Sequence, residues 1–412
     1  MMKQPAIAKQ KPKVFYLSPF SPAAYNYGAR MRCAFIADAL SSCAELCVWV
    51  MRYKVSDMDP TKRAVCWEHQ EFDEIPDTRL RKFSRLLRGV FLNAPISADH
   101  YHSRDRLGLI IHKLVSYHPD IVILGNSHLG FFEPIVRKYA PDAAIVLDTH
   151  NVEWLAYKRL AETASTRLQV IKNMILSRCT QQLEKRVSLS CDEVWTVSDN
   201  DAHAFASFGA ERIHVIPNTI PLEQYQPLPL SGNRTISFIG LYDYSPNEQA
   251  ALFMIACSHR LKRKGVEHTL ILIGANPTPK MYADAGNADH IRITGEVPSA
   301  RDEILKADIL AAPIIAGGGT KFKIIEAFAL GRAVVTTPLG SEGLTLRHGR
   351  DALICPLDQF DANVASVLES LPLAQHLGKH GRAWVEANLS PAKIQYRIIE
   401  RIETIANQLR MH

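Results

Sequence analysis

The fold of this chain is decided by residues 308–343, which read DILAAPIIAGGGTKFKIIEAFALGRAVVTTPLGSEG. The apolar run 308–312 predicts a buried strand, and three glycines follow it. The amphipathic run from Thr320 to Leu330 predicts a helix that Gly331 ends, and residues 333–337 predict a second buried strand. This unit is typical of a parallel α/β sheet. Its helix N-terminus offers bare amides to an anion, and the glycines allow the anion to approach closely.

The charges on the predicted helix indicate what kind of anion binds there. Lys321 and Lys323 lie in the first turn, where the helix dipole disfavours cations unless an anion faces them. Glu326 follows among apolar neighbours, and a carboxylate in that setting can accept hydrogen bonds from sugar hydroxyls. Amides and lysines for a diphosphate, with a carboxylate for a ribose, favour a nucleotide diphosphate. The alternative is a solvated helix in which Lys323 and Glu326 pair at i, i+3.

Short apolar strands alternate with helices along both halves of the chain, which indicates parallel sheets. A stretch rich in proline and polar residues, 217–233, interrupts the alternation and is typical of a linker. We therefore predict an α/β fold of two Rossmann-like domains that face a central cleft. The expected parts are a first domain over 1–221, a linker over 222–234, a second domain over 235–390 and a C-terminal helix over 391–412. We also expect one long helical tract over 152–189 and an insertion over 56–117.

In such a fold the ligand lies beyond the carboxyl ends of the strands, so the first domain should supply the second wall of the cleft. The predicted strand 144–147 is followed by DTHNVE, which ends at Glu153. His150 is the candidate catalytic residue in this group, and the alternative is a histidine with a structural hydrogen bond. Gly28 and Arg32 follow the first strand and form a possible acceptor or phosphate loop, or a plain turn. A nicotinamide dinucleotide site is not expected, because the glycine pattern of such sites is missing here.

Around residues 317–335 the chain resembles glycosyltransferases of the GT-B fold, in the large retaining family called family 4 or group 1. The family pattern closes with Glu-Ala-x-Ala-x-Gly-x-Pro-Val-Val, and residues 326–335 read EAFALGRAVV. The pattern opens with a Glu that contacts the donor sugar, and this Glu falls on Gly318. The chain instead resembles the branch with Gly-Gly-Gly-Thr-Lys-x-Lys at this point. The resemblance is strong over 193–390 and weak over 1–142.

The resemblance implies transfer of a sugar from a nucleotide diphosphate sugar to a hydroxyl acceptor, with retention at the reacting carbon. The acceptor would be a glycan, a lipid-linked sugar or a polysaccharide precursor of the cell envelope. It also implies that His150 contacts the donor sugar, that Glu326 contacts the ribose and that the helix over 391–412 packs back on the first domain. The expected donor-binding residues are Gly318, Gly319, Thr320, Lys321, Lys323, Glu326, Gly240 and Glu342.

Two other functions remain open at this point. A nucleotide-sugar epimerase or phosphorylase could use the same fold. A non-catalytic nucleotide-sugar-binding subunit is the other alternative, because Gly318 replaces the family Glu and the glycine pair expected before Gly28 is missing.

The composition indicates the class of protein, its compartment and its partners. The content is 47% hydrophobic and 22% charged, which is ordinary for globular domains, and the eight cysteines are scattered in a way that favours reduced thiols. The start of the chain has no apolar signal segment, so we expect a cytoplasmic protein.

The net charge of +6 is partly concentrated in Arg79, Arg81, Lys82, Arg85 and Arg88. That segment predicts peripheral contact with an anionic membrane or, alternatively, a solvated helix face. Nucleic acid is not expected as a partner. No metal or other cofactor is expected, because the pair Asp57 and Asp59 makes an unconvincing metal motif.

Overall fold

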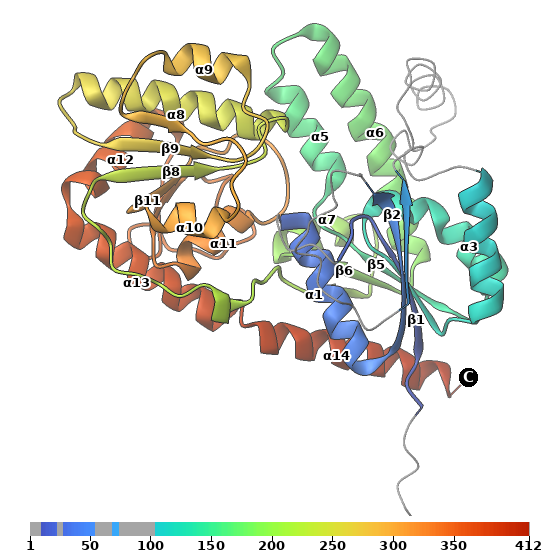
Figure 1. Ribbon diagram of the computed structural model, residues 1–412. Helices are drawn as coiled ribbons and strands as arrows, with labels where there is room; N and C mark the ends of the chain where they lie inside the picture. The colour runs from blue at the N-terminus through green and yellow to red at the C-terminus, as the bar shows by residue number, and fades with distance from the viewer. Residues whose placement is uncertain (1–9, 23–27, 54–67, 74–103, 412) are drawn as a thin grey trace, which may run out of the picture.

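Two parallel β-sheets covered by helices form two domains that lie side by side (Figure 1). The computed structural model describes residues 10–22, 28–53, 68–73 and 104–411. Strand residues alternate between two apolar clusters, as when Val14 and Tyr16 pack on one face and Phe15 and Leu17 on the other. Burial on both faces explains why these strands are short apolar runs. The α/β class with two Rossmann-like domains is confirmed.

The first sheet has seven parallel strands in the order β3-β2-β1-β4-β5-β6-β7. Their bounds are β1 Lys13–Ser18, β2 Glu45–Tyr53, β3 Glu68–Asp73, β4 Ile121–Leu124, β5 Ala144–Asp148, β6 Glu193–Thr196 and β7 Ile213–Val215. The helices of this domain are α1 Gly28–Cys43, α3 Arg104–Tyr117, η3 Ser127–Phe132, α4 Glu133–Tyr139, α5 Glu153–Glu162, α6 Arg167–Ser190 and α7 Asp199–Ala206.

The second sheet has six parallel strands in the order β10-β9-β8-β11-β12-β13. The strands are β8 Thr235–Ile239, β9 Thr269–Ile273, β10 Ile291–Ile293, β11 Ile309–Ala312, β12 Ala333–Thr336 and β13 Leu353–Ile354. The helices are α8 Ser245–Arg263, α9 Pro279–Ala285, α10 Ala300–Leu305, α11 Phe322–Ala329, α12 Leu357–Glu369 and α13 Leu371–Asn388. A 3₁₀ turn, η4 Leu222–Gln224, lies in the segment between the two sheets.

In each sheet the strand order reverses at the first strand, between β1 and β4 and between β8 and β11. Loops that leave the carboxyl ends of strands at such a point form the usual ligand crevice of open α/β sheets. The candidate residues follow β11, which borders the reversal in the second sheet, and β5, which lies one strand beyond β4 in the first. The topology therefore brings the sequence-predicted walls to corresponding edges of the two domains.

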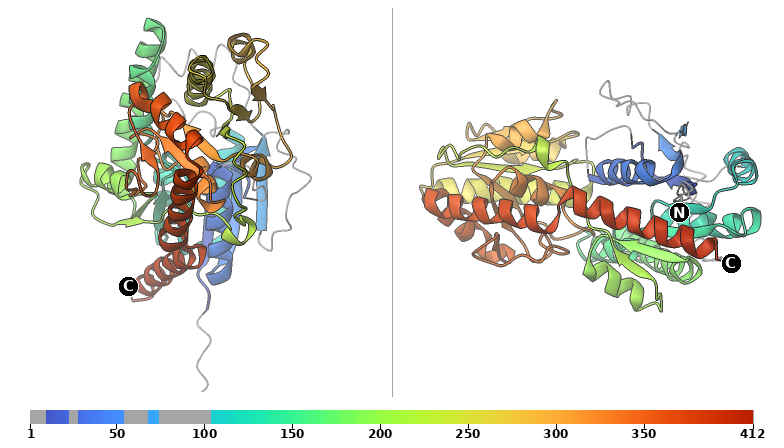
Figure 2. Two further views of the ribbon diagram at one scale, coloured as in Figure 1. Left: turned by 90° about the vertical axis from the view of Figure 1, so that its left-hand side faces the viewer. Right: turned by 90° about the horizontal axis from the view of Figure 1, so that it is seen from below.

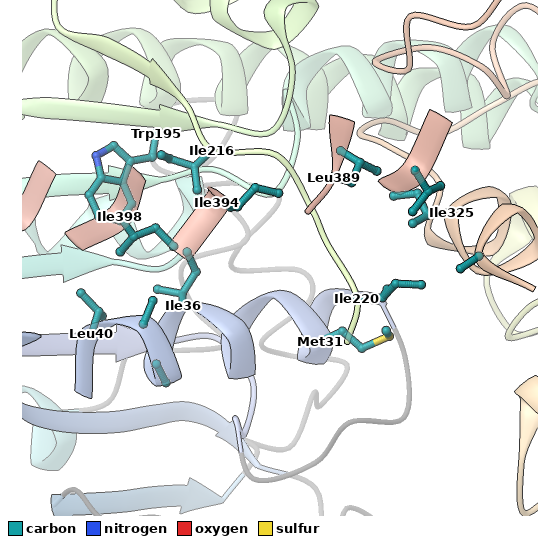
Figure 3. Close-up of a cluster of buried hydrophobic side chains, with 14 of the residues drawn as sticks. Met31, Ile36, Leu40, Trp195, Ile216, Ile220, Ile325, Leu389, Ile394 and Ile398 are labelled. Atoms are coloured by element: carbon teal, nitrogen blue, oxygen red, sulfur yellow. The ribbon is translucent and has the colours of Figure 1, made fainter. Parts of the chain in front are cut away.

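Helix α14, Pro391–Leu409, crosses from the second domain and packs along α1 of the first (Figure 2). Its residues Ile394, Ile398, Ile402 and Ile405 are buried at helical spacing. They belong to an apolar cluster that runs without a break from Leu40 and Trp195 in the first domain to Ile325 in the second (Figure 3). The two domains therefore share this cluster, and each also has an apolar cluster of its own on the other face of its sheet.

Three local expectations need correction or limitation. The helical tract predicted over 152–189 is two helices, because the chain turns at 163–166 and the Thr166 side chain caps α6 by accepting from the Gln169 amide. The helix predicted from Thr320 begins at Phe322, so Lys321 is its N-cap residue and Lys323 alone lies in its first turn. The basic segment with Arg79, Arg81, Lys82, Arg85 and Arg88 lies outside the described residues, as do Asp57 and Asp59.

Candidate functional site

The glycine-rich loop between β11 and α11 has the backbone geometry that only glycine adopts readily. Gly317 has φ of +100° and Gly319 has φ of +65°. At the far end of α11, Gly331 also has positive φ, and its amide and that of Arg332 donate to the carbonyls of Phe328 and Ala327. This is the C-terminal motif that a glycine at that position predicts. Helix α11 therefore begins shortly after Gly319 and ends shortly before Gly331.

The two lysines at this loop donate to neutral oxygens. Lys321 Nζ lies 2.9 Å from the carbonyl oxygen of Gly318 and 2.5 Å from that of Gly319. Lys323 Nζ donates to Asn247 Oδ1 at 2.8 Å and lies 4.3 Å from the ring centre of Phe238. Within the described part of the chain, neither ammonium has a carboxylate within 4.0 Å. Because no carboxylate among the described residues is paired with them, both ammonium groups keep the capacity to bind an anion.

Burial lowers the pKa of both lysines, because it penalises the charged form. The pKa of Lys321 falls to about 8, although the charge of Glu342 opposes the shift. The pKa of Lys323 falls to about 7, with the neighbouring Lys321 charge as a second cause. A bound diphosphate would favour the charged form of both lysines and raise these values.

Glu326 lies on α11 one turn beyond Lys323 and accepts a hydrogen bond from Tyr225 at 2.9 Å. Burial raises its pKa to about 7, while the Tyr225 hydrogen bond and the Lys323 charge act in the opposite direction. The alternative pairing of Lys323 with Glu326 is not seen as a hydrogen bond, since each side chain has a different partner. The carboxylate therefore keeps one oxygen with no hydrogen bond in the described structure.

Gly240 and Glu342 follow two strands of the second domain, β8 and β12, which lie on either side of β11. Gly240 follows β8, and a Cβ there would lie 2.7 Å from Asn247 Cγ, so glycine allows the Lys323 partner to pack against the strand. Glu342 makes a two-pronged ion pair with Arg159 of α5, at 2.6 Å for each oxygen. This pair joins the second domain to the first.

His150, the candidate catalytic residue, lies just after β5. Its Nε2 is 3.9 Å from Cys33 Sγ. Burial, together with the charge of Arg32, lowers the pKa of His150 to about 3, so the ring is neutral near pH 7. A neutral imidazole can donate or accept a hydrogen bond at a sugar hydroxyl.

Arg32 lies inside the first domain. Its guanidinium pairs with Asp148 at the end of β5 and donates to the Ile216 carbonyl at 2.9 Å and to Asn218 Oδ1 at 3.1 Å. Asn218 in turn donates to Thr320 Oγ1 of the glycine loop at 2.7 Å. Arg32 thus holds Asp148, two residues before His150, and is linked through Asn218 to the predicted donor residue Thr320.

Two carboxylates, Glu153 and Glu184, lie at the start of α5, which follows His150 along the chain. Glu184 on α6 accepts hydrogen bonds from Ser127 at 2.7 Å and from the amides of Glu153 and Trp154, which open α5. Burial raises the pKa of Glu184 to about 8, with the Glu153 charge adding to the effect. Burial also raises the pKa of Glu153 to about 7. Glu184 holds the two amides that open α5 and so positions Glu153, whose side chain is hydrogen-bonded with Asn151.

The first domain closely approaches the glycine loop. A Cβ on Gly318 would lie 3.3 Å from Ala156 Cβ, and one on Gly319 would lie 2.8 Å from the His150 carbonyl oxygen. Gly28, predicted as part of a loop for acceptor or phosphate, would place a Cβ 2.6 Å from the ring of Phe322. Arg159 also donates to the Gly317 carbonyl at 3.0 Å. The close approach that these glycines allow is made in this structure by protein from the other domain.

The structure therefore brings His150 together with Gly318, Gly319, Thr320 and Lys321 at one junction, with Lys323 and Glu326 further along α11. Several polar residues of this region were not singled out by the sequence. They are Arg159, Glu184, Asn218, Tyr225 and Asn247, whose partners lie far away along the chain. Asn218 and Asn247 had a sequence signal, because the segments 215–219 and 238–247 resemble the family's hinge and the opening of its second domain.

Comparison with known proteins agrees with this architecture. Residues 233–371 match the family model described as glycosyl transferases group 1. A phosphatidyl-myo-inositol mannosyltransferase of Mycolicibacterium smegmatis is 27% identical over 161 residues, which are 37% of this chain and 41% of that protein. A mannosyltransferase of the same name from Mycobacterium tuberculosis is 27% identical over 165 residues, or 38% of this chain and 43% of that protein. The matched stretch thus spans about two fifths of these relatives.

Solved structures resemble the chain over nearly its full length. Sucrose-phosphate synthase from Thermosynechococcus elongatus aligns with a TM-score of 0.74 at 14% identity, covering 96% of this chain and 100% of that one. Anabaena HepE in complex with UDP and glucose aligns with a TM-score of 0.66 at 13% identity, covering 95% and 100%. At such identities the likeness shows the fold alone. The chain has the two-domain GT-B fold, and its second domain matches the group 1 glycosyltransferase model.

Proposed function

We propose that the chain transfers a sugar from a nucleotide diphosphate sugar to a hydroxyl acceptor, with retention at the reacting carbon. The observation that carries the proposal is the pair Lys321 and Lys323 at a glycine-rich helix N-terminus, two partly buried cations that pair with no carboxylate among the described residues. Glu326, placed further along the same helix, suits a ribose. The match of residues 233–371 to group 1 glycosyltransferases and the UDP-glucose bound by Anabaena HepE support the same donor class.

The chemistry follows from where charge develops. Departure of the nucleotide diphosphate is the demanding step, and its growing negative charge is stabilised by preorganised amides and ammonium groups. Residues 317–320 and the two lysines would supply these groups. His150, neutral at pH 7, would hold a hydroxyl of the sugar beside the reacting bond. The leaving phosphate can take the acceptor proton, so the proposal requires no protein base.

The acceptor proposed is a glycan or a lipid-linked sugar of the cell envelope. The named relatives that act on phosphatidyl-myo-inositol support a lipid-linked acceptor. We further propose that the enzyme works in the cytoplasm, at the inner face of the membrane. In the described part of the chain, no helix combines the length and the apolar character needed to cross a bilayer.

Incubation with a panel of UDP- and GDP-sugars tests the proposed function. We expect one donor to be hydrolysed slowly without acceptor, and to be used faster when an acceptor hydroxyl is supplied. Product stereochemistry by NMR tests retention. Tight nucleotide binding without hydrolysis of any donor would instead favour a non-catalytic subunit. Interconversion of the sugar on its nucleotide would indicate an epimerase, and phosphate-dependent cleavage a phosphorylase.

Replacing Glu326 with alanine should weaken binding of the matching nucleotide diphosphate about 10- to 150-fold, because a charged hydrogen bond of about 1.5–3 kcal/mol is lost. Calorimetric titration measures the change. Glu369→Ala is the matched control, since Glu369 is an exposed carboxylate at the end of α12 in the same domain. Equal affinity for wild type and a folded Glu326→Ala variant would remove Glu326 from the site.

Activity should persist in excess chelator, because Lys321 and Lys323 already supply cations at the proposed diphosphate site. The measurement compares turnover in EDTA with turnover in added Mg²⁺ or Mn²⁺. Loss of all turnover in EDTA, with recovery on adding a divalent ion, would show that a metal is required.

A further inference from the structure

Helices α5 and α6 form an antiparallel hairpin that projects from the first domain at the top of Figure 1, on the side opposite α14. The lower half of α6 is anchored in the domain through buried residues that begin at Ser177. The first two turns of α6 lie beyond this anchor, and residues 165–172 are all exposed. The side chains of the hairpin tip therefore face solvent and are not part of the domain's packing.

That surface is apolar. The exposed fractions are 77% for Leu168, 58% for Ile171 and 49% for Met174, and Val170 is exposed as well. These four side chains fall within seven residues of one helix. Scattered single apolar residues are normal on a protein surface, but a contiguous apolar patch marks a contact with a partner or a membrane.

The polarity of α6 is reversed at its tip. At 3.6 residues per turn, Leu168, Ile171 and Ile175 lie on one side of the helix. Gln169 and Asn173 lie on the side that continues downward into the buried face. The apolar side at the tip thus points away from the body of its own domain. Its burial against the domain does not explain why these residues are apolar.

The charge of the tip indicates what covers it. Between Thr163 and Leu183 the sequence has no acidic residue, and it has the basic residues Arg167, Lys172 and Arg178. Apolar side chains flanked by basic residues on a helix suit the headgroup region of a bilayer that contains anionic lipids. The basic residues would meet lipid phosphates while Leu168 and Ile171 enter the acyl boundary.

We propose that the tip of the α5–α6 hairpin, residues 166–175, docks on an anionic membrane surface. This contact does not depend on the proposed sugar transfer. If the chain does transfer a sugar, membrane docking at the tip would also help to bring in the acceptor. Helix α5 starts at Glu153, three residues after His150, and has ten residues. At 1.5 Å per residue it spans about 15 Å. A lipid-anchored acceptor could therefore keep its tail at the docked tip while its hydroxyl head reaches the site.

Vesicle sedimentation of the full chain tests the proposal, using phosphatidylcholine vesicles with or without phosphatidylglycerol at low and high salt. We expect wild type to sediment with the anionic vesicles at low salt and to stay in solution with the neutral ones. Leu168→Ser/Ile171→Ser should weaken this binding at least about tenfold, because two exposed aliphatic side chains no longer enter the bilayer. Arg167→Gln/Lys172→Gln should weaken binding to anionic vesicles and reduce its salt dependence.

Leu189→Ser is the matched control, since Leu189 is 52% exposed near the other end of α6. It should bind as wild type does. Melting temperature and nucleotide binding should be unchanged in all variants, which separates this test from the proposed function. Failure of wild type to bind anionic vesicles would overturn the proposal, as would wild-type binding by both tip variants. A concentration-dependent dimer in sedimentation velocity that Leu168→Ser/Ile171→Ser abolishes would identify a second copy as the occupant instead.

Discussion

Replacing Lys321 and Lys323 together with alanine is expected to abolish most of the thermal stabilisation that the matching nucleotide diphosphate gives to wild type. Each ammonium would contribute a charged hydrogen bond of about 1.5–3 kcal/mol to a bound diphosphate. Loss of both should weaken binding by roughly a hundredfold or more, and the ligand-induced rise in melting temperature should shrink accordingly. Melting curves with and without UDP and GDP measure this. An equal shift in wild type and variant would place the anion site elsewhere.

Without ligand, the double alanine variant should be at least as stable as wild type near pH 7. The pKa values of about 8 for Lys321 and about 7 for Lys323 lie below the ordinary lysine value of 10.5. Between about pH 7 and pH 10.5 the unfolded state therefore binds more protons than the folded state, so wild-type stability rises with pH in this window. The variant lacks both groups and should lack that rise. At pH 7, where wild type bears the cost of burying the charges, the unliganded variant should melt at the same temperature or higher.

Replacing Arg32 with methionine is expected to destabilise the first domain by about 3–5 kcal/mol, because it leaves Asp148 buried without its counter-charge. Asp148 Oδ2 already lacks a hydrogen-bond partner among the described residues. Urea unfolding measures the loss. Burial raises the pKa of Asp148 and the Arg32 charge opposes this, so removing Arg32 should raise the pKa further. The variant's Asp148 then keeps its proton to higher pH than in the unfolded chain, and the stability loss should grow with pH.

Two controls accompany this experiment. Arg212→Met removes an exposed arginine of the same domain and should change stability by no more than about 0.5 kcal/mol. Arg32→Met/Asp148→Asn removes both charges and should recover part of the loss. A variant Arg32→Met as stable as wild type would show that Asp148 is held by other groups.

The sequence predicted those parts of the fold that depend on local patterns. Strand β11, helix α11 and strand β12 follow from apolar runs and from Gly331, whose left-handed conformation needs no information from distant residues. Strand β3 was missed because its sequence, EHQEFD, is polar and lies at the edge of the sheet. The break between α5 and α6 was missed although Thr166 carries a capping signal, because the flanking residues are good helix formers.

The site was predictable as a set of residues but not as a set of contacts. Lys321, Lys323 and Glu326 could be named from their spacing on one helix. Their hydrogen-bond partners could not, since Asn247 lies 76 residues from Lys323 and Tyr225 lies 101 residues from Glu326. The ion pair of Arg159 and Glu342 joins residues 183 apart. Such pairs are set by how the domains pack, and a single sequence does not encode that packing in any local pattern.

The path of α14 bears on how the chain folds while it is being made. The apolar side of α1 is completed by Ile394, Ile398 and Ile402, which follow the last strand of the first domain by nearly the whole second domain. At a synthesis rate of about 5–20 residues per second, these side chains are made roughly 10–40 seconds after the rest of the first domain. During that interval it exposes an uncovered apolar surface on the ribosome. The first domain of this protein therefore reaches its final stability only after the second has been synthesised, which reverses the usual order of completion along a two-domain chain.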